Sequence, residues 1–338
     1  MESNYQKNKP KETWIQVLRA FACICVLFCH SPAPTDGNTP GMYMLAPFNY
    51  LFMAWGVSVF FMISGALLFA KEQKLVPFYK KRLNRILMPI IIWSIIYICV
   101  SRIYDTPDKS IMHQIFLIPF YEQEGLLWFM YSLVGIYLIS PIISVWISHS
   151  ERKEIEIVLG IWAVSLFIPY LSVIDQDIKN INYGILRYFW GFVGYALLGY
   201  YIRKYVNIPI KSITFWVLVL IAFLMPLIIF FTKVLPVDVL NTSFSISSAL
   251  MSVVAFLFFK NLDFRNNRLL KIILLFAEFS FGIYLCHMIF LKPFNLWISQ
   301  FHMHYAIQVP ISGIIIGIIS FLFVWLLSKI PYSKFLFG

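Results

Sequence analysis

The chain has 338 residues, of which 60% are hydrophobic, 18% aromatic and only 13% charged. A soluble domain carries roughly 25% charged residues, so this composition excludes an ordinary soluble protein and indicates an integral membrane protein. The net charge of +11 does not require a nucleic-acid partner. Basic residues at the inner rim of a membrane protein lie against anionic lipid headgroups, and no segment combines a soluble fold with a basic patch.

Apolar stretches recur along the whole chain, each near the ~20 residues that a helix needs to cross a bilayer. The connections between them are too short for a soluble domain. We therefore expect an all-α integral membrane protein, a bundle of about ten transmembrane helices, with residues 1–338 forming one membrane domain. The stretches lie near residues 14–30, 48–69, 86–101, 126–148, 158–174, 188–202, 215–231, 243–259, 272–291 and 309–327.

The distribution of basic residues predicts the orientation, because Lys and Arg accumulate in cytoplasmic connections. With the N-terminus inside, 20 of the 27 Lys and Arg lie in segments predicted to be cytoplasmic, six lie in outer segments, and Arg19 lies within the first stretch. This asymmetry predicts that both termini are cytoplasmic.

The first stretch has basic residues before it and small residues after it, as a secretory signal peptide has. Arg19 in the middle of its apolar region argues against that interpretation. The cysteines all fall within predicted helices and form no Cys-x-x-Cys pair, so we interpret them as packing residues rather than metal ligands or disulfide partners. They are Cys23, Cys25, Cys29, Cys99 and Cys286.

Arg19 and His30 lie eleven residues apart in the first stretch. Eleven helical steps place both side chains on one face, about 16 Å apart along the axis. An ionisable residue at membrane depth suggests function. An imidazole can take a proton from a hydroxyl near neutral pH, whereas an arginine serves as a clamp or counter-charge. Alternatively, His30 is an ordinary interfacial residue and Arg19 is structural.

Several segments together resemble a known family. The spacing of Arg19 and His30 is similar to the signature of the acyltransferase 3 family, the ten-helix membrane acyltransferases that acylate bacterial surface glycans. The resemblance covers Thr13 to about Leu291 and indicates the short form that consists of the membrane domain. The further matching segments are Val59-Phe-Phe-Met-Ile-Ser-Gly65, Phe78-Tyr-Lys-Lys-Arg82-Leu-Asn-Arg85-Ile-Leu-Met-Pro89, Leu127-Trp-Phe-Met130 and Ser280-Phe-Gly-Ile-Tyr-Leu-Cys-His287.

The resemblance implies an O-acetyltransferase of the bacterial inner or plasma membrane. Its donor would be acetyl-CoA or another acyl-CoA, its acceptor a hydroxyl of an extracytoplasmic glycan or glycolipid, and no metal would be needed. Arg82 and Arg85, three residues apart at the inner rim, would hold the coenzyme A phosphates, since guanidinium groups match phosphate oxygens. The alternative is that they are the basic residues expected in any cytoplasmic connection.

Ser64 and Gly65 are small residues in a bulky segment and would let the acyl-pantetheine arm pass, although helix packing alone also explains them. Trp128 could stack on a sugar ring or simply lie at the membrane interface. His287 would lie at a depth similar to that of His30, as an orienting residue, an oxyanion donor or a lone interfacial histidine. Glu278 would be a buried carboxylate that either pairs with Arg19 or helps a proton path. The outer connections 31–47 and 102–125 could cover an outward-facing pocket.

We thus expect His30 and Arg19 to be catalytic, with the acceptor hydroxyl deprotonated by His30. A direct transfer and a route through an acyl-enzyme both remain open, but Cys29 and Ser31 point away from His30 on a helix. The rival function is a glycan or lipid exporter without acyl-transfer chemistry, since ten helices with polar groups at depth would serve either. A membrane sensor or scaffold has no signalling domain to support it.

Overall fold

The computed structural model describes residues 12–31, 54–104, 110–174, 191–232, 243–301, 303–331 and 333–337. All regular secondary structure in these ranges is helical. The elements are α1 (Thr13–His30), α3 (Ala54–Leu68), α4 (Leu75–Tyr104), α5 (Ile111–Leu117), η1 (Gly125–Leu127), α6 (Trp128–His149), α7 (Arg152–Ser165), α8 (Ile168–Ile174), α10 (Phe192–Tyr205), α11 (Ile213–Thr232), α13 (Ile246–Lys260), α14 (Arg268–Ile298), η3 (Ser299–Phe301), α15 (Tyr305–Leu327) and α16 (Lys334–Phe337).

The expectation of an all-α, multi-pass membrane protein is confirmed. Within the described ranges, six helical segments are long and apolar enough to cross a membrane, and three shorter apolar helices accompany them. The remaining predicted stretch corresponds to α10, which carries Arg203 and Lys204 in its last turn. The six long segments are Thr13–His30, Leu75–Tyr104, Gly125–His149, Arg152–Leu171, Arg268–Phe301 and Ile307–Leu327, and the shorter helices are Trp55–Leu68, Ile213–Ile229 and Ile246–Lys260.

Several predicted boundaries differ from the structure, and two of these differences change the elements themselves. The third stretch was expected from residue 86, but α4 begins at Leu75, so the basic segment is the first part of one long helix. The fifth stretch is divided into α7 and α8. Pro169 lies at the second position of α8, where its missing N–H costs nothing, whereas inside a continuous helix it would remove a backbone hydrogen bond.

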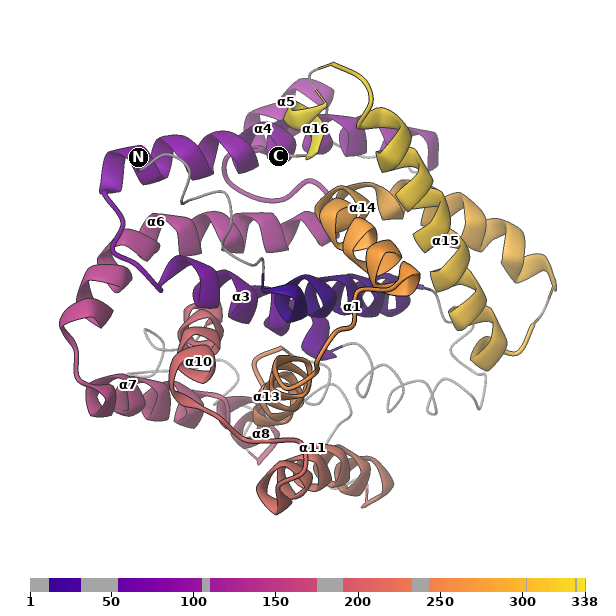
Figure 1. The fold of residues 1–338 in the computed structure, drawn as a ribbon. Helices are drawn as coiled ribbons and strands as arrows, with labels where there is room; N and C mark the ends of the chain where they lie inside the picture. Colours follow the sequence, from indigo (N-terminus) through magenta and orange to yellow (C-terminus); the bar gives the residue numbers. More distant parts are fainter. Residues whose placement is uncertain are drawn as a thin grey trace.

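The first long helices alternate in direction. In Figure 1, α3 and α6 run opposite to α4 and α7, and α1 lies at the centre of the bundle. α3 packs closely on α10 because glycines face backbone at the crossing. A Cβ atom on Gly65 would lie 1.9 Å from the carbonyl oxygen of Ala196, and one on Gly199 would lie 2.0 Å from that of Met62. The two helices therefore approach as closely as backbone allows.

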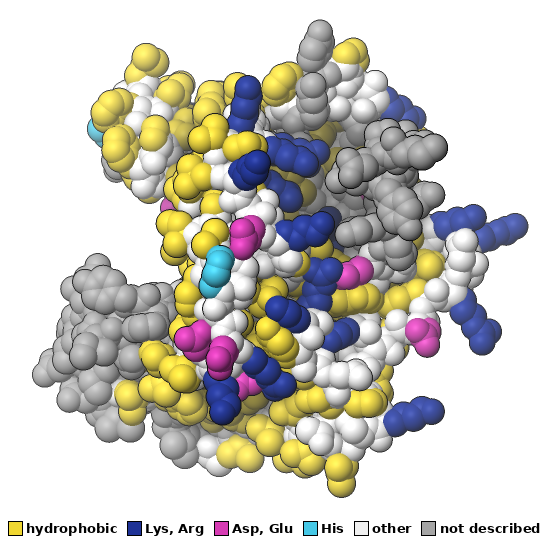
Figure 2. All heavy atoms as spheres, turned by 60° about the vertical axis from the view of Figure 1, so that its left-hand side comes forward, with side chains coloured by type: hydrophobic (Ala, Val, Ile, Leu, Met, Phe, Trp, Pro, Cys, Tyr) yellow, Lys and Arg dark blue, Asp and Glu magenta, His cyan; other side chains and the backbone are white. Residues whose placement is uncertain are grey.

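Polar contacts join helix ends that the charge pattern predicts to be cytoplasmic. The Arg203 guanidinium at the end of α10 donates to Glu12, just before α1, with Nε···Oε1 3.2 Å, and also to the Ala66 carbonyl in α3. The Lys260 ammonium at the end of α13 donates to the Val206 carbonyl at 2.6 Å. On this side of the molecule Lys and Arg side chains form a strip with few carboxylates (Figure 2).

Other contacts join segments that are predicted to be on the outer side. The Lys292 ammonium in α14 lies 3.0 Å from the Glu124 carboxylate, just before η1. The Tyr131 hydroxyl in α6 donates to the Ile118 carbonyl at 2.5 Å, which fixes the segment after α5. Of the two outer connections predicted to cover a pocket, the first lies outside the described residues except for Ser31, and the second is described at residues 102–104 and 110–125.

Candidate functional site

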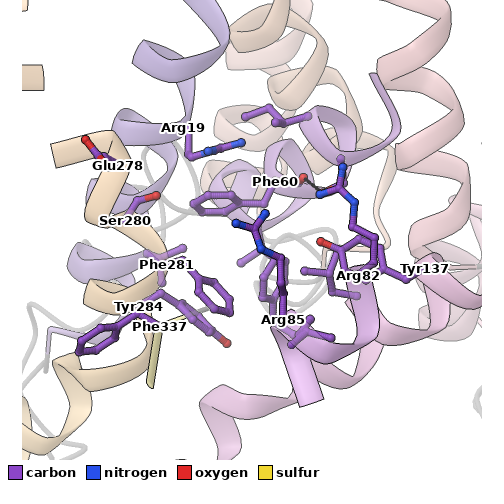
Figure 3. A pocket seen from close by; sticks show the side chains of 17 residues that line it. Arg19, Phe60, Arg82, Arg85, Tyr137, Glu278, Ser280, Phe281, Tyr284 and Phe337 are labelled. Carbon is purple, nitrogen blue, oxygen red and sulfur yellow. Dashed lines mark hydrogen bonds between the residues drawn. The ribbon is translucent and has the colours of Figure 1, made fainter. Parts of the chain in front are cut away.

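An open cavity with about 1140 Å³ of empty space lies among α1, α3, α4, α6, α14 and α16. Three arginines line it, Arg19 from α1 and Arg82 and Arg85 from α4, and Figure 3 shows their guanidinium groups pointing toward its middle. Tyr137 from α6 also lines the cavity and lies within electrostatic reach of all three arginines. The structure thus brings together three of the basic residues that the sequence singled out.

None of these three arginines forms an ion pair with a carboxylate of the described part of the chain. Arg19 donates only a long hydrogen bond, 3.4 Å, to the amide oxygen of Gln16. Because cations held together repel each other unless an anion lies between them, such a cluster favours a ligand with several negative charges. Planar guanidinium groups suit phosphate oxygens in particular.

The expectation that Glu278 is a buried carboxylate paired with Arg19 is wrong. Glu278 lines the same cavity but its side chain is exposed, and the structure records no ion pair between it and Arg19, although both are described. In Figure 3 Glu278 lies on α14, across the cavity from Arg82. A carboxylate that borders open space needs no buried partner, because water can solvate it.

The structure separates Ser64 from Gly65. Ser64 lines the cavity, and its hydroxyl donates to the Phe60 carbonyl one turn earlier at 2.9 Å. Gly65 is buried against the backbone of α10, with Ala196 as its nearest contact. Gly65 therefore fits the helix-packing alternative, and Ser64 alone of the pair borders the space that a ligand would fill.

Val26, Phe129 and Tyr284 also line the cavity. The Tyr284 hydroxyl donates to the Leu126 carbonyl, and its ring packs edge-on against Phe129 with centroids 5.3 Å apart. Tyr284 is only 7% exposed, so its position is fixed by contacts on both sides. These side chains form one wall of the cavity.

His30 and His287 meet one helical turn beyond Val26 in α1 and Tyr284 in α14. Nδ1 of His30 lies 3.2 Å from Nε2 of His287 and 3.0 Å from the Val26 carbonyl oxygen. Nδ1 of His287 lies 2.7 Å from the Tyr284 carbonyl oxygen. His287 is completely buried, whereas His30 is half-buried. The prediction that the two histidines lie at a similar depth is thus confirmed by their contact.

The hydrogen-bond partners determine the tautomers of both rings. A carbonyl oxygen can only accept, so Nδ1 of His30 and Nδ1 of His287 each carry a proton. Nε2 of neutral His287 then has a lone pair and accepts from Nδ1–H of His30. This arrangement leaves Nε2 of His30 unprotonated, as a proton acceptor needs to be.

The histidine pair and the cavity share two residues. Val26 and Tyr284 line the cavity, and their carbonyls accept from His30 and His287. The imidazoles therefore lie one helical turn further along α1 and α14 than these two lining residues. The Glu124 carboxylate lies within electrostatic reach of His30, and its ion pair with Lys292 ties η1 to α14 beside the histidines.

Trp128 lies apart from the lining of the cavity. Its ring stacks on Phe192, with centroids 5.2 Å apart and planes inclined by 27°. That contact occupies one face of the indole, so at most the other face is left for a sugar ring. In the structure Trp128 is part of the aromatic packing between α6 and α10.

Several aromatic residues line the cavity although their sequence context assigned them no role, among them Tyr137, Tyr284 and Phe337. Tyr284 lies one helical turn before His287 and so shares its face, which is a signal that the sequence does contain. Tyr137 and Phe337 carry no such signal, because tyrosine and phenylalanine are abundant throughout the chain.

Comparison with known proteins identifies the family. The model of the acyltransferase 3 family, described as an acyltransferase domain, matches residues 12–329. No curated protein and no solved structure matches the chain. The matched segment includes every helix that lines the cavity except α16. With this match over most of its length, the chain belongs to the acyltransferase 3 family of membrane acyltransferases.

Proposed function

We propose that the protein transfers an acetyl group from acetyl-CoA to a hydroxyl of an extracytoplasmic glycan or glycolipid. One observation carries the proposal: a cavity with three arginines is also lined by two residues whose carbonyls orient a pair of histidines. The arginines suit a polyanionic donor, and the histidines suit proton transfer from a hydroxyl.

The donor would be held by its phosphates. Arg82 and Arg85 bind coenzyme A from the cytoplasmic side, and Arg19 guides or neutralises it deeper in the cavity. Ser64 borders the path of the pantetheine arm. The rise of about 16 Å between Arg19 and His30 along α1 is of the order of an extended pantetheine chain. The thioester thereby reaches the part of the cavity beside Val26 and Tyr284.

The reaction would take place at Nε2 of His30. This nitrogen accepts the proton of the acceptor hydroxyl while the hydroxyl oxygen attacks the thioester carbonyl carbon. The new C–O bond forms, the C–S bond breaks, and the proton passes to the coenzyme A thiolate. The products are an O-acetyl ester and free coenzyme A. Because Tyr284 lines the cavity whereas His30 does not, we expect the Tyr284 side chain to move when the donor binds.

We also propose the arrangement in the membrane. Residues 1–338 form one domain of ten transmembrane helices in a bacterial plasma membrane, with both termini cytoplasmic. The contacts of Arg203 with Glu12 and of Lys260 with Val206 support this, because they join ends that the charge pattern assigns to one side. The ion pair between Lys292 and Glu124 likewise joins two predicted outer segments.

Labelled acetyl-CoA tests the function. Membranes that contain the protein are incubated with acetyl-CoA labelled in the acetyl group, and the glycans of cells with and without the gene are compared by mass spectrometry. The proposal predicts that the label appears in a glycan fraction of the membranes. It also predicts that glycans of cells without the gene lack one acetyl group. Glycan that disappears from the surface, with no transfer of label in membranes, would instead indicate an exporter.

A further inference from the structure

The short helix α16 forms part of the wall of the arginine cavity. Its residue Phe337 lines the cavity together with Phe281 and Tyr284 of α14 (Figure 3). The helix is anchored to α4, since the Trp93 indole Nε1–H donates to the Leu336 carbonyl at 2.8 Å. The rings of Trp93 and Phe337 lie 6.3 Å apart. After α15, the chain thus folds back onto the membrane helices.

A glycine in α14 makes room for this side chain. A Cβ atom on Gly282 would lie 2.9 Å from Cδ1 of Phe337 and 2.7 Å from Cγ1 of Val324 in α15. Any larger residue at position 282 would displace one of these side chains. The ring of Phe337 therefore lies in the space that a larger side chain at position 282 of α14 would need.

Phe337 lies at the level where the acyl group would arrive. Gly282 precedes His287 by five residues, about 7.5 Å of helix rise, and Tyr284 lies between them in sequence. The arginines line another part of the cavity (Figure 3). A donor whose phosphates are held by Arg82 and Arg85 would place its acyl end nearer the aromatic part of the wall, beside Phe337.

This part of the wall lies outside the segment that matches the family. The match ends at residue 329 and α16 begins at Lys334. The match to the family therefore says nothing about Phe337, and its role is argued from its place in the cavity.

We infer that Phe337 limits the length of the acyl group that the cavity accepts, so that the enzyme uses acetyl-CoA and discriminates against longer acyl-CoA donors. This inference rests on the proposed function. The ring fills space on the α14 side of the cavity, where it packs against Gly282, and an apolar site discriminates about 10–200-fold for each methylene added or removed. Removing the ring would open space next to the thioester.

The test compares donors of different length in the full-length protein, reconstituted in lipid vesicles. The kcat/KM values for acetyl-CoA and butyryl-CoA are measured for the wild type, Phe337→Leu and Phe337→Ala. We expect the butyryl-to-acetyl ratio to rise at least about ten-fold in Phe337→Ala and less in Phe337→Leu. Phe335→Ala is the matched control, because Phe335 lies on the same helix, is 41% exposed and does not line the cavity. It should leave the ratio unchanged.

The outcomes separate this inference from the proposed function. An active Phe337→Ala enzyme with the wild-type ratio overturns the role of Phe337 and leaves acetyl transfer intact. The same ratio change in Phe335→Ala would also overturn it, since the effect would then belong to the helix as a whole. If Phe337→Ala does not fold, the ratio in Phe337→Leu decides. A wild type that uses neither donor overturns the proposed function, and this inference with it.

Discussion

Nδ1 of His30 and Nε2 of His287 lie 3.2 Å apart, although the two residues are 257 positions apart in the sequence. Since each Nδ1 also faces a main-chain carbonyl oxygen, the two rings are held in one pattern of protonation. His287 has both nitrogens occupied within the protein. His30 has Nε2 left, and it is the less buried of the two. The two histidines therefore suit different roles: His30 suits proton transfer, and His287 suits the orientation of His30.

Replacing His30 tests whether it is the general base of the reaction. We expect His30→Ala to lower kcat for acetyl transfer by at least about 10²-fold, the usual contribution of a positioned general base. The KM for acetyl-CoA should change little, because the arginine cavity remains. Transfer of labelled acetyl groups in purified membranes measures both. Wild-type activity in His30→Ala would exclude His30 as the base.

Replacing His287 tests whether it orients the His30 imidazole. His287→Gln can still offer an acceptor oxygen to Nδ1–H of His30, whereas His287→Leu removes that acceptor at similar volume. We expect kcat to fall about ten-fold in His287→Leu, as for other residues that orient a functional imidazole, and to recover partly in His287→Gln. The Val26 carbonyl remains as a second partner of His30, which limits the loss. Equal losses in both variants would indicate a role in packing instead.

The KM for acetyl-CoA tests whether Arg82 and Arg85 of α4 bind the donor. We expect Arg82→Ala and Arg85→Ala each to raise the KM for acetyl-CoA by about ten-fold or more, since a hydrogen bond to a charged group contributes about 1.5–3 kcal/mol. The effect on kcat should be smaller. Lys81→Ala is the matched control, because Lys81 is exposed on the same helix and does not line the cavity.

Acetyl-dephospho-CoA shows which phosphate each arginine binds. This donor lacks the 3′-phosphate, so an arginine that holds that group should no longer matter when it is absent. The variant of that residue would show the same KM as the wild type for the shortened donor. If both variants retain the wild-type KM for acetyl-CoA itself, neither arginine belongs to the donor site.

The sequence predicted the helices well because the bilayer imposes one requirement on all of them, an apolar stretch of sufficient length. Arg19 and His30 could be recognised for the same reason, since ionisable residues stand out in such a stretch. Partners across the bundle could not be recognised. Glu278 was assigned to Arg19 by depth alone, whereas the structure leaves it exposed at the cavity.

Gly65 shows why such assignments fail. A small residue beside a functional segment is equally compatible with a ligand and with another helix, and the sequence does not say which neighbour approaches. In the structure the neighbour is the backbone of α10 at Ala196. Phe337 is the opposite case, because an ordinary apolar residue near the C-terminus becomes part of the site only when the chain folds back.

The contact of Gly65 with α10 predicts a loss of stability rather than of donor affinity. In Gly65→Ala the new methyl group would lie 1.9 Å from the Ala196 carbonyl oxygen, and neither backbone can move without separating α3 from α10. Overpacking of this kind costs typically about 1–3 kcal/mol. We expect a lower midpoint of thermal unfolding in detergent, with an unchanged KM for acetyl-CoA in the protein that remains folded.

Gly135→Ala in α6 is the control, because no atom lies within 4 Å of the added Cβ. It should be neutral or slightly stabilising, since alanine is the better helix former. A raised KM with unaltered thermal stability in Gly65→Ala would place this residue beside the donor after all.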